Sequence, residues 1–185
     1  PRIVHLIGSG AYNTNNTVLL GTAEGGLKVT LYRINSLPST ITGAYLNTNY
    51  MKTVHHEFMH ILHQTKNFSD DFQHISGTDY IGSEWSSNSN TEANALKLGF
   101  ISRYSRMNYH EDFVEIIAYF ITNSEAWWTS RLASMGTDGA AIMNQKFTIV
   151  ESYLKNTWGI DIYQLRDVVQ FRSNNIENMT WEPIK

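Results

Sequence analysis

The spacing of hydrophobic residues changes along the chain and divides it into a strand-rich first part and a helical remainder. Residues 2–8 and 27–34 are rich in β-branched and other apolar side chains, which predicts two strands, and Gly21, Gly25 and Gly26 punctuate the segment between them. Residues 36–40 are typical of a loop, and we expect 41–47 to form a short strand or an extended edge.

Helical periodicity begins at about residue 50. Within 50–64, apolar residues recur at the three- and four-residue intervals of one helix face. Residues 66–90 are polar and irregular, and helical signals return after them. The further helices expected are Asn90 or Thr91 to Leu98, 111–122, 125–134 behind Ser124, Thr137 or Asp138 to Asn156, and Asp161 to Arg172. A small sheet followed by a mainly helical part, without a repeat or a linker, predicts one α+β domain over residues 1–185.

The composition is that of an ordinary globular chain, because 42% of the 185 residues are hydrophobic and 17% are charged. The net charge of −3 argues against a nucleic-acid binder. The sequence contains no run of 18 apolar residues, so it predicts no membrane-spanning helix. The absence of cysteine excludes disulfides and thiolate metal sites. Because the sequence starts at Pro1 without an initiator methionine or a signal-like segment, we expect a trimmed C-terminal part of a longer precursor.

The strongest chemical signal is the H-E-x-x-H pattern formed by His56, Glu57 and His60. Residues four apart share a helix face, so the two histidines can bind one metal ion while Glu57 reaches a water at that ion. Two imidazole ligands and a general base are the pattern of a zinc hydrolase. The competing interpretation, a surface helix that is rich in histidine by chance, predicts no further ligand elsewhere.

Two more histidines flank the motif. His63 lies seven residues after His56, about 10 Å along the helix axis, so a straight helix cannot easily bring both of them and His60 to one ion. We therefore expect His63 to support a ligand or to belong to the core, and His55 to be packed or solvated.

A catalytic zinc usually has three protein ligands and one open position. Without cysteine, the third ligand must be His, Asp or Glu, and the downstream candidates are Asp70, Asp71, His74, Asp79, Glu84, Glu92, His110, Glu111, Asp112 and Glu115. Glu111 and Glu115 stand out because they lie four apart on a predicted helix whose other side is apolar. One can bind the metal while the other accepts the N–H of a ligand imidazole, although an ordinary acidic solvated face is the alternative.

Two segments, HEFMH (56–60) and YSRMNYHEDFVEIIA (104–118), resemble the gluzincin domains related to anthrax lethal factor. With the pattern HExxHxxH, they resemble more closely a family of bacterial zinc metallopeptidases that are lipoproteins associated with outer-membrane nutrient import. The resemblance spans about residues 27–120. It implies a zincin-like fold with a small N-terminal sheet, the HExxH helix and a glutamate-ligand helix, and Zn²⁺ as the cofactor.

The resemblance also implies roles for individual residues. Those that match the family's functional positions are His56, His60 and Glu111 as metal ligands, Glu57 as general base, Glu115 as the acidic residue one turn after the ligand, Tyr104 as a tyrosine that points into the site, and His63 as the third histidine of the pattern. It leaves the role of His63 open.

Together these residues predict a zinc metallopeptidase. Glu57 would accept the proton of a zinc-activated water, and the Tyr104 hydroxyl is the candidate donor to the oxyanion. Further residues that could line the cleft are Arg103, Arg106, Tyr109 and His110. Two alternatives stay open: a zinc hydrolase of a non-peptide amide, and a non-catalytic zinc-containing component of an import system. The latter is disfavoured because a structural zinc site needs no base.

The expected substrate is a peptide or protein that lies extended along a sheet edge, which residues 27–34 or 41–47 could supply. Tryptophans are expected in the core more often than at the substrate; they are Trp85, Trp127, Trp128, Trp158 and Trp181. No nucleic acid is expected, and membrane association is expected only through a lipid anchor outside this chain. The resemblance implies an extracytoplasmic location in the bacterial cell envelope, with an outer-membrane import complex as a candidate partner.

Overall fold

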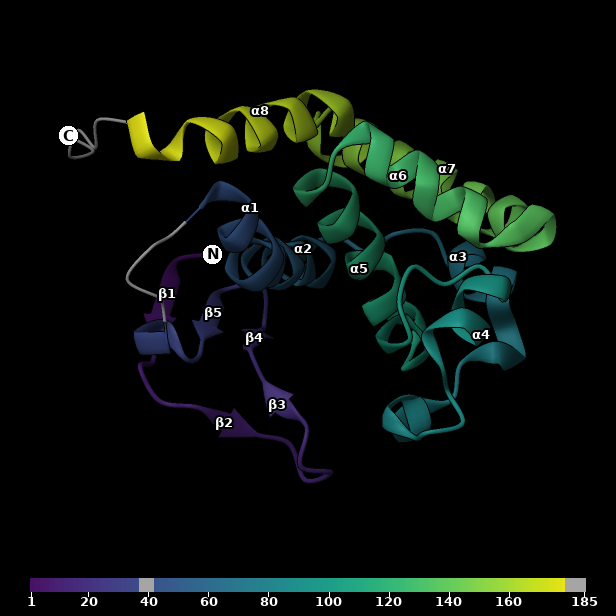
Figure 1. Ribbon diagram of the computed structural model, residues 1–185, viewed down its shortest axis with the longest axis horizontal. Helices are drawn as coiled ribbons and strands as arrows, with labels where there is room; N and C mark the ends of the chain where they lie inside the picture. Colours follow the sequence, from purple (N-terminus) through teal and green to yellow (C-terminus); the bar gives the residue numbers. More distant parts are fainter. Residues whose placement is uncertain (37–41, 179–185) are drawn as a thin grey trace.

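The computed structural model describes residues 1–36 and 42–178, and Figure 1 shows a small sheet beside a larger helical part. The sheet has the strand order β1 (Ile3–Leu6), β5 (Lys28–Leu31), β4 (Gly21–Glu24). β5 is parallel to β1 and antiparallel to β4, with Gly21 opposite Leu31. The predicted strands 2–8 and 27–34 are therefore present. Because β5 is paired on both sides, 27–34 cannot offer the free edge that we expected of it, and β1 and β4 are the edge strands instead.

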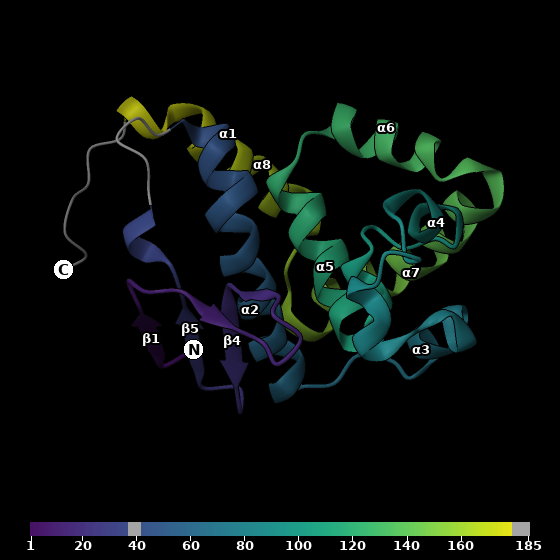
Figure 2. The ribbon, with the colours of Figure 1, turned by 60° about the horizontal axis from the view of Figure 1, so that its bottom comes forward.

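A second, two-stranded sheet pairs β2 (Ala11–Tyr12) with β3 (Val18–Leu19) in antiparallel order. Figure 2 shows this hairpin reaching from the sheet toward the helical part. At its tip the Asn15 side-chain amide donates to the Ser86 hydroxyl at 3.4 Å, which joins the two parts across the intervening cleft.

The expectation of a strand at 41–47 is wrong. Residue 41 lies outside the described residues, as do 37–40 of the expected loop, and Gly43–Leu46 form helix α1. The Thr42 hydroxyl caps it by accepting from the N–H of Tyr45 at 3.2 Å. A π-helical stretch, Asn47–Met51, then continues into α2 (Lys52–Thr65). The Thr42 cap and the long helix that follows therefore favour a helix over the expected strand in this segment.

The helical part agrees with the expected pattern. Its helices are α3 (Asp71–Ser76), α4 (Glu92–Lys97), α5 (Tyr109–Thr122), α6 (Glu125–Ser134), α7 (Gly136–Trp158) and α8 (Ile162–Asn175). The side chains of Thr91, Ser124 and Asp161 accept from the first backbone N–H groups of α4, α6 and α8, as predicted. The segment 66–90, which looked irregular, contains α3 and two short 3₁₀ turns.

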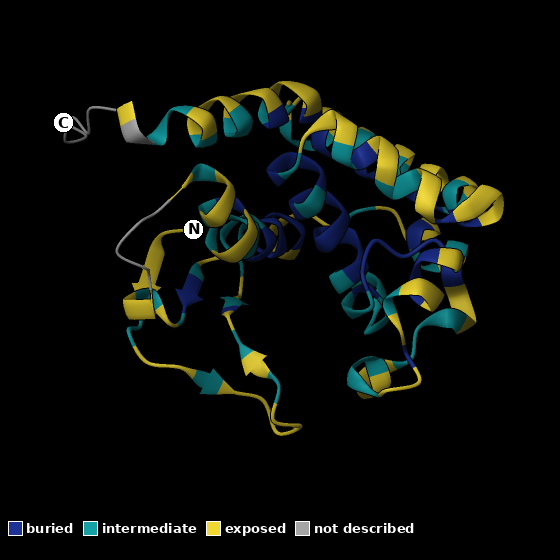
Figure 3. Cartoon of the chain, viewed as in Figure 1, coloured by how far each residue is buried: buried dark blue, intermediate teal, exposed yellow. Residues whose placement is uncertain are grey.

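The main core surrounds α5, which is mostly dark blue in Figure 3 beyond its first turn. A smaller cluster of Val29, Leu31 and Ile61 fixes the sheet to one side of α2, while α5 packs on another side. α2 is therefore held between the two parts of the molecule, which is where its histidines lie. Among the described residues, no helix combines the length and the apolar character that crossing a bilayer requires.

Candidate active site

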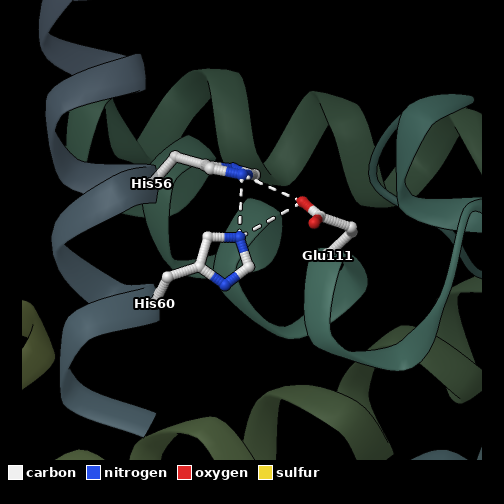
Figure 4. A group of neighbouring side chains, drawn as sticks. All are labelled: His56, His60 and Glu111. Atoms are coloured by element: carbon white, nitrogen blue, oxygen red, sulfur yellow. Dashed lines mark hydrogen bonds and ion pairs between the residues drawn. The ribbon is translucent and has the colours of Figure 1, made fainter. Parts of the chain in front are cut away.

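The two motif histidines and Glu111 converge on one point between α2 and α5, as Figure 4 shows. The Nε2 atoms of His56 and His60 lie 3.2 Å apart. The Oε2 atom of Glu111 lies 3.0 Å from His56 Nε2 and 3.3 Å from His60 Nε2. Glu111 is in the first turn of α5, which begins behind Asn108, whose side-chain oxygen accepts from the N–H groups of His110 and Glu111.

The spacing of these three atoms fits a tetrahedral zinc ion. With metal–ligand bonds of about 2.0–2.1 Å, the ligand atoms of a tetrahedron are about 3.3 Å apart. Here the three separations are 3.0, 3.2 and 3.3 Å. Two imidazoles and a carboxylate are also a donor set that zinc uses in hydrolytic sites. The chance-histidine interpretation predicted no such third group.

The electrostatics of the site favour a cation. Burial opposes charge on His56, but its hydrogen bonds to Glu111 and Glu115 outweigh burial and raise the pKa of the imidazole to about 10. Burial likewise opposes charge on Glu111, yet the hydrogen bonds to His56 and His60 lower the pKa of its carboxyl. Two carboxylates thus hold positive charge at this point, whether a proton or a metal ion supplies it.

Glu115 lies behind His56 and not among the three donors. Its Oε1 is 3.0 Å from His56 Nδ1 and accepts from the Lys52 ammonium at 3.1 Å, while its Oε2 accepts from the Ser102 hydroxyl at 2.8 Å. An imidazole that offers Nε2 to a metal carries its hydrogen on Nδ1, so Glu115 is placed to accept that hydrogen and to fix the ring. Burial opposes the charge, but Lys52 and His56 lower the pKa of Glu115 to about 2.

His63 holds the same position behind His60. Its Nε2 is 2.8 Å from His60 Nδ1, and its ring stacks on His110 with centroids 4.9 Å apart. Burial lowers the pKa of His63 to about 4, so the ring is neutral at pH 7 and can accept the His60 hydrogen. His63 is both buried and in contact with His60, and its role in supporting a metal ligand stays a prediction. His55 is partly buried on α2, and burial lowers its pKa to about 4.

Glu57 lies beneath strand β4. A methyl group added at Gly21 would stand 2.6 Å from Glu57 Cγ, so only glycine allows β4 to pass this close. Glu57 is not among the three metal-donor residues, and its burial raises the pKa of its carboxyl. A buried carboxylate that lies next to a group of metal donors, but is not itself a donor, has the placement of a general base.

A cavity of about 290 Å³, which we call the metal cleft, opens onto His56 and Glu57 between the hairpin, β4 and the helical part. His56, Glu57 and Tyr104 all line it. The Tyr104 ring lies 6.0 Å from the His56 ring and 4.8 Å from that of Trp85. Burial and the nearby Glu111 carboxylate raise the pKa of Tyr104, so its hydroxyl keeps its hydrogen at neutral pH.

Several expected residues lie elsewhere. Of the four secondary candidates for the cleft, only Arg103 lines it, and its guanidinium donates to the carbonyl oxygens of Trp85 and Ser87. Arg106 binds Asp79 and Asn90, and His110 stacks on His63. Candidate ligands that do not join the three donors are Asp70, Asp71, His74, Asp79, Glu84, Glu92, His110, Asp112 and Glu115.

Sequence reasoning missed three features of the cleft. Lys52 pairs with Glu115, and it could have been found because it stands four residues before His56 on the same helix face. Trp85 lines the cleft although we placed tryptophans in the core, where Trp128 does lie; Trp181 lies outside the described residues. Gly21 gave no local signal, because its role depends on a tertiary contact.

Fold and site together define an α+β metal-binding protein whose donors come from an HExxH helix and from a glutamate on a second helix. The chain belongs to the family described as "Putative zinc-binding metallo-peptidase", which matches residues 1–163. A crystal structure of a "putative zinc-binding metallo-peptidase" from Bacteroides caccae ATCC 43185 is similar to it, with 36% sequence identity and a TM-score of 0.78 over 97% of this chain and 67% of that chain. No curated protein matches the chain. Zinc is the metal in both descriptions, in agreement with the predicted cofactor.

Proposed function

We propose that this protein is a zinc-dependent peptidase that hydrolyses peptide bonds through a water activated by Glu57. The observation that carries the proposal is the placement of Glu57, a buried carboxylate that borders the metal donors without being one of them. A structural zinc site fills all four positions with protein ligands. Within residues 1–36 and 42–178, the group of potential ligands at this point has only three members.

Zinc held by His56, His60 and Glu111 would supply Lewis-acid chemistry, since it lowers the pKa of a water toward about 7 and polarises a carbonyl oxygen. Glu57 takes the proton of the attacking water and returns it to the leaving amine. Its raised pKa brings it closer to the working pH, which makes both transfers easier. Glu115 and His63 keep the two imidazoles in the tautomer that presents Nε2.

Tyr104 is the proposed donor to the oxyanion. It lines the metal cleft beside His56, and its raised pKa keeps the hydroxyl protonated. A hydrogen bond that forms only as charge develops on the carbonyl oxygen lowers the barrier without tightening substrate binding.

The substrate backbone is proposed to lie along β4. This strand ends the sheet, and the residues before and at its start, Leu19, Leu20 and Gly21, line the metal cleft. An extended peptide can add to such an edge by main-chain hydrogen bonds, which hold it regardless of sequence. The carbonyl to be cleaved then stands over Glu57 and His56.

The test is a digest of a peptide library by zinc-loaded protein, compared with the Glu57→Gln variant. We expect Glu57→Gln to keep one zinc per chain and its melting temperature, and to lose about 10²–10⁴-fold in turnover. Elemental analysis and thermal melting provide the controls for metal and fold. Full turnover by Glu57→Gln would exclude the mechanism, and a zinc-loaded parent that cleaves no peptide would exclude the peptidase.

The envelope location and the import complex stay proposals that rest on the sequence resemblance alone. Fractionation of the native host, followed by cross-linking of intact cells, tests both. Recovery of the protein in the cytoplasmic fraction would contradict them and leave the peptidase proposal intact.

A further inference from the structure

A second, larger cavity of about 580 Å³ lies beside the metal cleft, between the sheet and the helical segment that leads into α2. Leu31 and Ile34 line it from the sheet side, and Tyr45, Tyr50 and Val54 from the helical side. We call it the side cavity. None of the residues described here as lining it is Asp or Glu, while Arg33 brings positive charge to its wall and the Lys52 ammonium is paired with Glu115.

The two cavities share a wall. Val18, Leu20, Lys52 and Thr53 line both, so the side cavity directly adjoins the metal cleft. Val18 and Leu20 are 41% and 43% exposed, although both are large apolar side chains at the end of the sheet. Apolar side chains that are exposed in a hollow of the surface are the usual lining of a ligand pocket.

The helical segment that runs from α1 into α2 sets how far the side cavity lies from the reacting bond. Val54 lies two residues before His56 and Tyr45 lies eleven before it, so the lining extends from about 3 to 16.5 Å along the helix axis. An extended peptide advances about 3.3 Å per residue, and alternate side chains point to the same side. A side chain one to three residues from the cleaved bond therefore reaches the side cavity.

We infer that the side cavity is the specificity pocket of this protein, and that it takes a large apolar or aromatic side chain of the substrate, one to three residues from the cleaved bond. This inference rests on the proposed peptidase function. The tyrosine and leucine walls favour such a side chain by burial, and the Arg33 guanidinium disfavours lysine and arginine there. Because the pocket opens only on the N-terminal side of His56, the preference belongs to one side of the bond.

The test is a positional-scanning peptide library digested by the zinc-loaded protein and read by mass spectrometry. We expect Phe, Tyr and Leu to be preferred over Ala by about 10–100-fold at one position within three residues of the bond, with Lys and Arg depleted there. The Thr48→Trp variant places an indole in the side cavity from an exposed helical position and should bring the preference to within twofold of Ala. Thr148→Trp, at an exposed position of α7 that lines neither cavity, is the matched control and should keep it.

An unchanged preference in Thr48→Trp, or no preference in the parent, would overturn the pocket and leave the peptidase intact. If the parent cleaves nothing, the peptidase proposal fails, and a peptide-binding experiment then tests whether the side cavity takes an aromatic side chain. The same library is then captured on immobilised zinc-loaded Glu57→Gln protein. Enrichment of aromatic peptides that is lost when Thr48→Trp is added supports the pocket, and equal capture by both proteins refutes it.

Discussion

Replacing Glu115 should weaken zinc binding strongly without abolishing it. Its carboxylate contacts His56 Nδ1 at 3.0 Å, and it also holds the Lys52 ammonium and the Ser102 hydroxyl. In Glu115→Ala the imidazole loses the partner that fixes its ring and raises its basicity. Loss of such a partner typically costs 10–100-fold in metal affinity.

The upper end of that range applies here, because Glu115 is only 2% exposed and water cannot readily replace it. A 100-fold loss corresponds to about 2.8 kcal/mol, at about 1.4 kcal/mol per tenfold. The Glu115→Gln variant separates the effect of ring orientation on zinc affinity from the effect of negative charge. Its amide oxygen can still accept from His56 Nδ1, so ring orientation survives while the negative charge is lost, and we expect about a tenfold loss.

The measurement is a titration of zinc-loaded protein with a chromophoric chelator at fixed pH. Glu125→Ala is the matched control, since the Glu125 side chain is 83% exposed on α6, and its zinc affinity should stay within twofold. Glu111→Ala, which removes a donor, should lose zinc at micromolar chelator. Retention of zinc by Glu111→Ala with complete loss in Glu115→Ala would show that the two roles are exchanged, and an unchanged affinity in Glu115→Ala would refute the supporting role.

Three further changes have distinct expected outcomes. Tyr104→Phe should lower kcat and kcat/KM together by about 10–100-fold at constant zinc content, and a change in KM alone would contradict the oxyanion role. Gly21→Ala should displace Glu57 and lower kcat about 100-fold with zinc retained, while Gly10→Ala, whose methyl group meets only atoms at 3.9 Å or beyond, should match the parent in the same assay. Lys146→Met leaves the fully buried Asp112 without the ammonium 2.8 Å away, and urea unfolding should show a loss of about 3–5 kcal/mol that does not appear in the exposed Lys155→Met.

Local signals explain why most helices could be predicted. A cap is a hydrogen bond between residues two or three apart. The starts of α6 and α8 can therefore be predicted from Ser124 and Asp161 alone, whatever the rest of the fold is. The same locality explains the error at 41–47. The Thr42 cap begins only a one-turn helix, and what keeps the segment helical is its continuation into α2.

The donor set was predictable because it depends on helix periodicity at two places. His56 and His60 share a face of α2, and Glu111 and Glu115 share a face of α5. Periodicity alone does not say which glutamate touches the metal. The assignment needs the register between α2 and α5, which places Glu111 beside the two Nε2 atoms and Glu115 behind His56.

The face of α2 that carries the two motif histidines also carries Lys52, and the position of Lys52 can be explained by the groups around it. Lys52, His56 and His60 repeat at four-residue spacing, so an ammonium stands on the face that binds the metal ion. A cation next to a cation site is unfavourable unless a carboxylate lies between them, and Glu115 occupies that place, 3.0 Å from His56 and 3.1 Å from Lys52. Lys52 also lines both the metal cleft and the side cavity. The side chain that balances the charge of Glu115 is thus also part of the wall shared by the two cavities, which ties the electrostatics of the metal site to the cavity next to it.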